Sequence, residues 1–167
     1  DTLILFSDSA QYRLAGGDLL TPNSVSISLT TQFEADLSCY PIGIGKNVYF
    51  TTDKGESTGV REYFISSDTQ VHDAADITAH VPTYLADNPK KLSGSSNQDL
   101  MVLLPGDSND PLYVYKYFWA GEQKLISSWS KWTFGTASTV LHHDFIDTCL
   151  YMVVQRSDGV YFEKICI

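Results

Sequence analysis

The chain has 167 residues, of which 43% are hydrophobic, and this is enough for one domain with a buried core. Twenty acidic and eleven basic residues give a formal charge of −9, which argues against binding to a phosphate backbone because such binding needs clustered Lys and Arg. No window is apolar enough to span a bilayer and the first ten residues lack the basic region of a signal peptide, so we expect no membrane anchor.

Four segments of the chain each contain an apolar strand, a polar turn and a second strand. They read LILFSDSAQYRL from Leu3, VYFTTDKGESTGVREYFI from Val48, LMVLLPGDSNDPLYVYKYF from Leu100 and LYMVVQRSDGVYFEKICI from Leu150. Their starts lie about 50 residues apart, which is the period of propeller blades. We therefore predict an all-β fold, a β-propeller-like array of about four blade-type antiparallel hairpin units. No named propeller signature is present, so an ordinary β-sandwich with regular hairpins is the alternative.

The two ends of the chain both look like strands. The chain starts without Met, directly ahead of the strand at Leu3, and it stops at Ile167 inside another strand. No linker or low-complexity segment divides the sequence between them. We therefore expect residues 1–167 to be a single domain that is a fragment of a longer protein.

Three stretches between the hairpins depart from the strand pattern. In Pro41–Lys46, PIGIGK, the two glycines predict a bend before the strand at Val48. Residues Val71–Leu85 lose the β-branched alternation, and we predict one short helical insertion there. Ile77, Val81 and Leu85 would face inward, because they are spaced at four. Residues Asp87–Asp99 are polar and rich in Gly and Ser, which predicts an exposed loop.

The stretch Leu112–Phe134 is the most aromatic part of the chain. Tyr113, Tyr115, Tyr117 and Trp119 alternate at a period of two, which places four rings on one face of a strand. A turn at Ala120-Gly121-Glu122 would return the chain along Lys124–Trp132. Because each ring buries ~150 to 250 Å², we expect this hairpin to be one layer packed against another sheet.

The histidines do not form a pattern typical of a metal site. His72 and His80, with Asp73 and Asp76 between them, lack the spacing of four that places two ligands on one helix face. His142 and His143 are neighbours in a strand, so their side chains point to opposite faces and we interpret them as solvent or turn histidines. We predict no metal site and no cofactor.

The strongest enzymatic hypothesis is a propeller-type glycosidase. Thr51, Asp53, Gly55 and Ser57 partly match the Asp-box turn of sialidases, and such enzymes use three arginines, the number found here, to hold a carboxylate. These are Arg13, Arg61 and Arg156. The turn occurs once, its aromatic residue is missing, and no tyrosine stands out as a nucleophile, so we predict no catalytic residues. Exposed aromatic side chains would alternatively allow glycan binding.

The chain has three cysteines. Cys149 and Cys166 face one another across the last hairpin if residues 156–159 form its loop. Without a secretion signal we interpret both, together with Cys39, as reduced and buried.

Four phrases of the sequence, in the same order and with similar spacing, resemble one known protein family. They are LTPNSVSISLTTQF (20–33), PIGIGKNVYFTT (41–52), ADITAHVPTYL (75–85), and YVYKYF with the later SWSKWTFG (113–118 and 128–135). The family is the tail tubular protein B, or nozzle protein, of short-tailed bacteriophages. Its members are several times longer than this chain.

This resemblance implies a structural virion component with no enzymatic activity. The full-length subunit would form a hexameric ring at the distal end of the tail, bound to the upper tail-tube adaptor ring, with tail fibres near the junction and DNA passing through without specific binding. A propeller-like domain within the subunit is implied as well. The protein would be assembled in the host cytoplasm and reside in the virion tail, and we expect the isolated segment to be monomeric.

Overall fold

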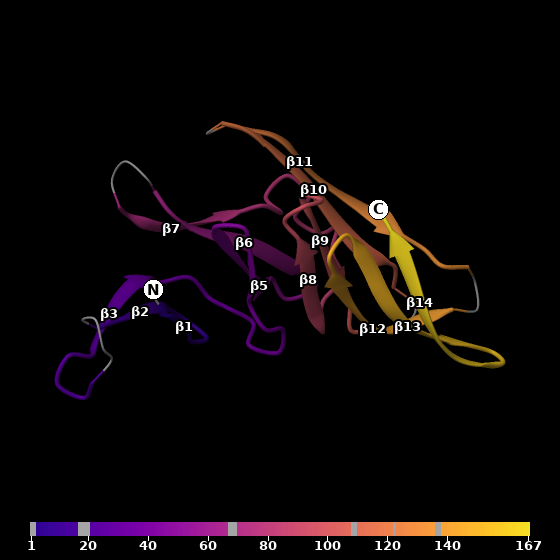
Figure 1. The fold of residues 1–167 in the computed structure, drawn as a ribbon, viewed down its shortest axis with the longest axis horizontal. Coiled ribbons are helices and arrows are strands. Elements are labelled where there is room, and N and C mark those ends of the chain that lie inside the picture. The colour runs from indigo at the N-terminus through magenta and orange to yellow at the C-terminus, as the bar shows by residue number, and fades with distance from the viewer. Residues whose placement is uncertain (1–2, 17–20, 67–69, 108–109, 122, 136–137) are drawn as a thin grey trace.

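The computed structural model describes residues 3–16, 21–66, 70–107, 110–121, 123–135 and 138–167. These residues form strands β1 to β14, arranged in four antiparallel sheets that we call A to D (Figure 1). Neighbouring strands in each sheet are consecutive in sequence, so every sheet is a meander. In the described part of the chain no helix is long and apolar enough to cross a membrane.

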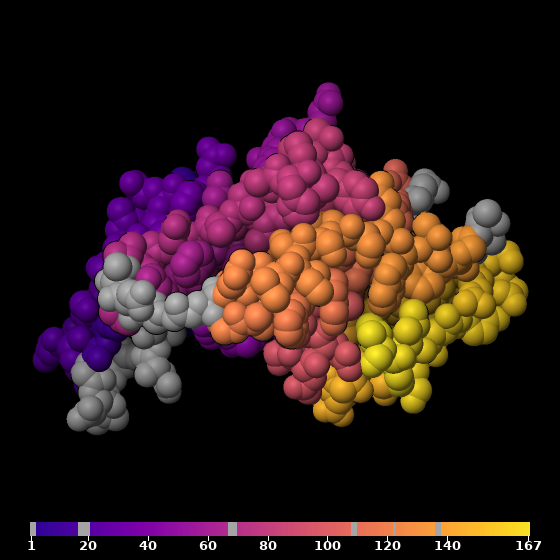
Figure 2. Space-filling model, turned by 90° about the horizontal axis from the view of Figure 1, so that it is seen from above, coloured from indigo at the N-terminus to yellow at the C-terminus, as the bar shows by residue number. Residues whose placement is uncertain are grey.

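The sheets follow one another along the chain. Sheet A contains β1 (Leu3–Phe6), β2 (Gln11–Ala15) and β3 (Ser26–Thr31); sheet B contains β4 (Ile42–Ile44), β5 (Asn47–Asp53), β6 (Thr58–Ile65) and β7 (His72–Asp76); sheet C contains β8 (Lys91–Ser95), β9 (Leu100–Leu104), β10 (Leu112–Ala120) and β11 (Gln123–Trp132); sheet D contains β12 (Thr139–Ile146), β13 (Cys149–Arg156) and β14 (Gly159–Cys166). They also follow one another in space (Figure 1), and the indigo N-terminal part and the yellow C-terminal part lie at opposite ends of the space-filling view (Figure 2).

All four predicted hairpins are confirmed. They correspond to the antiparallel pairs β1–β2, β5–β6, β9–β10 and β13–β14, and each pair lies in a different sheet. The repeat in the sequence is therefore a repeat of sheets. The all-β class is confirmed, whereas the four sheets do not close into a ring within the described residues, and the radial arrangement stays a prediction.

Three apolar cores join the four sheets. The core between A and B contains Phe6 and Phe50, whose ring centroids lie 5.1 Å apart. Sheet C is packed on both faces, because alternate residues of its strands point to opposite sides. Met101 and the three tyrosines of β10 belong to the core shared with sheet B, and Val102 and its even-numbered neighbours belong to the core shared with sheet D.

The aromatic hairpin is confirmed as β10–β11. Tyr113, Tyr115 and Tyr117 share the face toward sheet B, and Trp129 returns on β11 to pack with its ring centroid 5.0 Å from that of Tyr115. Trp119, beyond a bulge in the register, is 37% exposed. Of the predicted turn, Gly121 has a positive φ of 65°, and Glu122 lies outside the described residues.

The predicted helix at Val71–Leu85 is wrong. His72–Asp76 forms the edge strand β7, and its register with β6 buries Ala74 against the A–B core. This pairing outweighs the helix preference of Ala74 and Ala75, because intrinsic helix preference is weak compared with tertiary contacts. The inward-facing residues were partly predicted, since Ile77 and Leu85 are buried and Val81 is half-buried, but turns rather than a helix place them.

The predicted exposed loop at Asp87–Asp99 is also wrong in its centre. Residues Lys91–Ser95 form β8, the first strand of sheet C, in which Leu92 is 2% exposed. The small residues that suggested a loop instead permit close packing. A Cβ on Gly94 would lie 2.2 Å from Ile44 Cδ1, so a glycine at this position allows β4 and β8 to approach.

The bend predicted in the PIGIGK segment is confirmed at Gly45, whose φ is 62°. The segment before it, Ile42–Ile44, is the short strand β4 rather than part of the bend. The first strands of three successive sheets are therefore neighbours, because β4 and β12 both contact β8.

The three cysteines are in two different states. Cys149 and Cys166 are opposite one another in the register of β13 and β14, as predicted, but they form a disulfide instead of remaining reduced and buried. Their Cα atoms lie 4.1 Å apart, so strand pairing alone brings the two thiols together. Cys39 is confirmed as a free, buried thiol.

Candidate functional site: the junctions between sheets

The Asp-box-like residues form the β5–β6 turn. Asp53 Oδ1 accepts a hydrogen bond of 2.6 Å from the Gly55 backbone N–H, and Gly55 has a φ of 88°, which favours glycine. The Ser57 hydroxyl donates to the Pro82 carbonyl over 3.1 Å, and Thr51 is fully buried in β5. These contacts shape a hairpin and attach the segment after β7 to it, and none of them is directed at a ligand.

The three arginines lie on three different sheets. Arg13 is on β2, Arg61 on β6 and Arg156 on β13. Arg61 donates to the Ala74 carbonyl over 2.8 Å and stacks on Phe33, whereas Arg156 pairs with Glu163 over 2.7 Å. Arg61 and Arg156 thus have separate structural partners, and the arrangement differs from a clamp around one carboxylate.

The predicted histidine pair on β12 separates as expected, but one member is not at the surface. His142 faces outward, where its Nε2 lies 3.1 Å from Lys91 Nζ. His143 is 1% exposed and shares a hydrogen bond of 2.7 Å between its Nδ1 and the Ser93 hydroxyl of β8. Across the described residues no group of three or more His, Cys, Asp or Glu side chains could hold a metal ion. His80 is exposed and His72 contacts Tyr63.

The Ser93–His143 pair does not have the chemistry of a catalytic dyad. Burial, reinforced by the Lys91 charge, lowers the pKa of His143 to about 3, so the imidazole is a weak base near neutral pH. Its Nε2 has no hydrogen-bond partner among the described residues, and thus no carboxylate orients the ring. The pair joins β8 of sheet C to β12 of sheet D.

The most developed polar site of the described chain lies in a cleft of about 490 Å³ between sheets B and C. Glu62 of β6, with its side chain 4% exposed, forms an ion pair with Lys124 of β11. The same carboxylate accepts hydrogen bonds from Tyr49 Oη (2.6 Å) and Asn47 Nδ2 (2.9 Å). Lys124 Nζ lies 4.9 Å from the ring centroid of Trp119. Sheets B and C thereby share one buried ion pair, and both carboxylate oxygens of Glu62 have hydrogen-bond or ion-pair partners.

Two buried tyrosines near Glu62 are held in their protonated form. Burial first, and then the neighbouring Glu62 charge, raise the pKa of Tyr49 far above its ordinary value. Burial, together with the Asp99 charge, raises the pKa of Tyr117 to about 12. Both phenols stay protonated and act as hydrogen-bond donors or packing groups, so neither provides a nucleophile at neutral pH.

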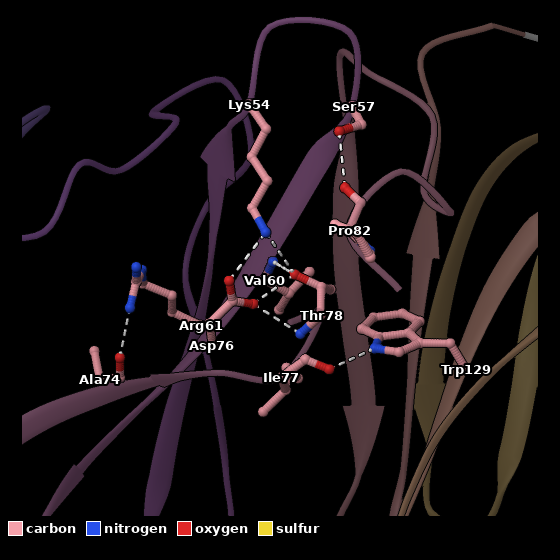
Figure 3. A network of polar contacts seen from close by, with 10 residues as sticks. All are labelled: Lys54, Ser57, Val60, Arg61, Ala74, Asp76, Ile77, Thr78, Pro82 and Trp129. Atoms are coloured by element: carbon pink, nitrogen blue, oxygen red, sulfur yellow. Dashed lines mark hydrogen bonds and ion pairs between the residues drawn. The ribbon is translucent and has the colours of Figure 1, made fainter. Parts of the chain in front are cut away.

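A second polar network fixes the segment that follows β7 (Figure 3). The Asp76 carboxylate accepts bonds from the Thr78 backbone N–H (2.8 Å) and hydroxyl (2.6 Å) and from Lys54 Nζ (2.9 Å). Although burial opposes it, these bonds hold the pKa of Asp76 below its ordinary value. Trp129 of sheet C donates from Nε1 to the Ile77 carbonyl over 3.1 Å, so this network also connects sheets B and C.

The family model described as bacteriophage nozzle protein matches residues 1–167. This chain belongs to the nozzle protein family. It is 31% identical over 166 residues to the protein of Escherichia phage T7 named tail tubular protein gp12. That match covers 99% of the present chain and 21% of the T7 protein, so the chain spans about a fifth of the length of this relative.

Family membership makes this chain a structural component of a phage tail. In the described residues of this nozzle-family chain, buried polar contacts are concentrated at the junctions between sheets. Sequence reasoning missed the Glu62–Lys124 and Ser93–His143 pairs, because their partners are 62 and 50 residues apart and belong to different sheets. A glutamate beside the aromatic residues of β6, a strand that also contains Arg61, is the sequence signal for the first pair.

Proposed function

We propose that residues 1–167 are a segment of a longer nozzle subunit and that sheets A to D are consecutive blades of a propeller-like array. Support comes from the order of the sheets, each a meander that packs face to face on the next. The neighbouring positions of β4, β8 and β12 support it as well, since first strands of adjacent blades meet near a propeller axis. The T7 relative, of which this chain matches 21%, supports a longer subunit.

Within the virion, we propose that the subunit forms part of the conduit for DNA ejection. It would assemble in the host cytoplasm into a hexameric ring, bind the upper tail-tube adaptor ring and lie near the tail fibres. The formal charge of −9 fits a wall that DNA passes without adhering, because an acidic surface repels phosphates. The segment would act through contact surfaces and perform no catalysis, since its buried polar groups are engaged in joining sheets.

The match of the family model to the whole chain is the observation that carries this proposal. An epitope inserted after Ser157, in the exposed β13–β14 turn, tests it in phage particles that contain the full-length protein. Electron microscopy with a labelled antibody should find the epitope at the tail of intact virions. Label on the capsid alone, or epitope-bearing protein that never enters particles although it folds, would contradict the proposal.

Association of the isolated segment provides a second test. Light scattering should give the mass of one 18.6 kDa chain, because the ring contacts would require the rest of the subunit. A mobility-shift assay at physiological salt should show no binding to duplex DNA. A stable hexamer of the segment would contradict the proposal that the ring contacts lie in the rest of the subunit. Salt-sensitive DNA binding would contradict the proposal that DNA passes without adhering.

A further inference from the structure

Sheet A lies at the N-terminal end of the array (Figure 1), and one of its faces carries exposed apolar side chains. The register aligns Leu3 with Leu14 and Ile27 in one row across the three strands. The next row on the same face aligns Leu5, Tyr12 and Leu29. We call these six side chains the outer face of sheet A. Four of them are exposed: Leu3 54%, Leu5 37%, Ile27 62% and Leu29 52%.

The opposite face of sheet A is already used. Ile4 and Phe6 alternate with Leu3 and Leu5 on β1, and they pack in the core shared with sheet B. The Phe6 ring lies 5.1 Å from Phe50 between centroids. Strands with apolar residues at every position are typical of sheets buried on both sides, and sheet C shows this arrangement in the same chain.

The outer face contains no charged side chain. Arg13 and Ser28 align with Ile4 on the other side of the sheet. At the opposite end of the array, by contrast, one row of sheet D aligns Asp144, Tyr151 and Lys164, so its outward side carries both charges. Scattered exposed apolar residues are ordinary, but complete apolar rows across three strands form a contiguous patch of the kind that marks an interface.

We propose that the outer face of sheet A binds a further antiparallel β-sheet of the same polypeptide. This inference rests on the proposed function, in which the chain is a segment of a longer subunit. Every junction between successive sheets in the described chain is made by one apolar face on another, so a further sheet continues the same chemistry. The length of the T7 relative leaves about four fifths of such a subunit to supply it. Contact with a second copy would instead cover the face only when the ring forms.

Thiol labelling of an Ile27→Cys variant tests whether a further sheet of the same polypeptide covers the outer face of sheet A. The background is low, because Cys39 is fully buried and the other two cysteines are joined in a disulfide. In the 167-residue segment a maleimide should modify the new thiol about as fast as in urea-unfolded protein. In the monomeric full-length subunit the rate should fall at least about tenfold, since the covering sheet belongs to the same chain. Rapid labelling in the full-length monomer would overturn the proposal, and protection that begins only on ring formation would assign the face to a second copy.

A charge substitution provides an independent readout. Ile27→Asp should lower the urea midpoint of the full-length monomer much more than that of the segment, in which the side chain is 62% exposed. Ser28→Asp is the matched control, since it adds the same charge one residue away on the other side of β3. Equal effects of the two variants in the full-length protein would contradict a specific apolar contact. If Ile27 is protected but the epitope-tagged protein never enters tails, the proposed function fails while the intramolecular contact stands.

Discussion

The buried His143 should make the folded chain sensitive to mild acid. Burial lowers the pKa of His143 to about 3, while an unfolded histidine titrates near its ordinary value of about 6.5. The unfolded state therefore binds a proton first as the pH falls, so the stability contribution is complete above about pH 6.5 and is lost between there and about pH 3. Each pH unit below about 6.5 removes about 1.4 kcal/mol, so His143 alone should lower the free energy of unfolding by about 2 kcal/mol at about pH 5.

Urea unfolding of the wild type and of His143→Asn, at about pH 7.5 and about pH 5, measures this effect. Asn keeps a polar atom near Nδ1 for the Ser93 hydroxyl, so the variant should fold, be less stable at the higher pH, and lose about 2 kcal/mol less on acidification. Asp76 and Asp144 have depressed pKa values and titrate only at lower pH, so they do not contribute in this window. His80→Asn, at an exposed position, is the control. Equal losses in the wild type and His143→Asn would refute the reasoning.

Other junction contacts give further predictions. Lys124→Ala should lower the free energy of unfolding by about 3 to 5 kcal/mol in urea titration, because it leaves the Glu62 carboxylate buried without its partner. The double variant Lys124→Ala/Glu62→Gln should recover part of this loss, since it removes the unpaired charge. Gly94→Ala should lower the free energy of unfolding by about 1 to 3 kcal/mol, because the added methyl group overpacks the contact with Ile44. Gly43→Ala, with no atom within 4 Å of its added Cβ, should lower it less in the same urea titration. Cys166→Ser should lower stability by about 2 to 4 kcal/mol in calorimetry, and a reducing agent should then have no further effect; an unchanged melting temperature would argue against the disulfide.

The elements that sequence analysis found share one property: their partners are close in the sequence. Hairpins such as β9–β10 join two apolar strands through a short turn, so alternation and turn residues together identify them. The tyrosines of β10 were predicted to face one layer because a period of two fixes the side of a strand on which a residue lies.

The elements that it missed depend on contacts across sheets. β8 is rich in Ser, Gly and Lys and has no strand signal of its own, yet Ser93 is buried against His143 and Gly94 against Ile44. The helix predicted near β7 failed because pairing with β6 is not visible in the local composition. The two cysteines were interpreted as reduced because the sequence has no secretion signal, although the predicted register already placed Cys149 opposite Cys166.

The polar pairs at the junctions give the stacked sheets a defined position that apolar packing alone would leave less specific. Aliphatic and aromatic faces tolerate small shifts, because the hydrophobic effect is non-directional and depends mainly on the area buried. A shift of sheet C against sheet B would separate Glu62 from Lys124 and leave a buried charge unpaired, at a cost of several kcal/mol. A shift against sheet D would likewise separate Ser93 from His143. These pairs therefore add little net stability over an apolar core but penalise a shift of one sheet against the next.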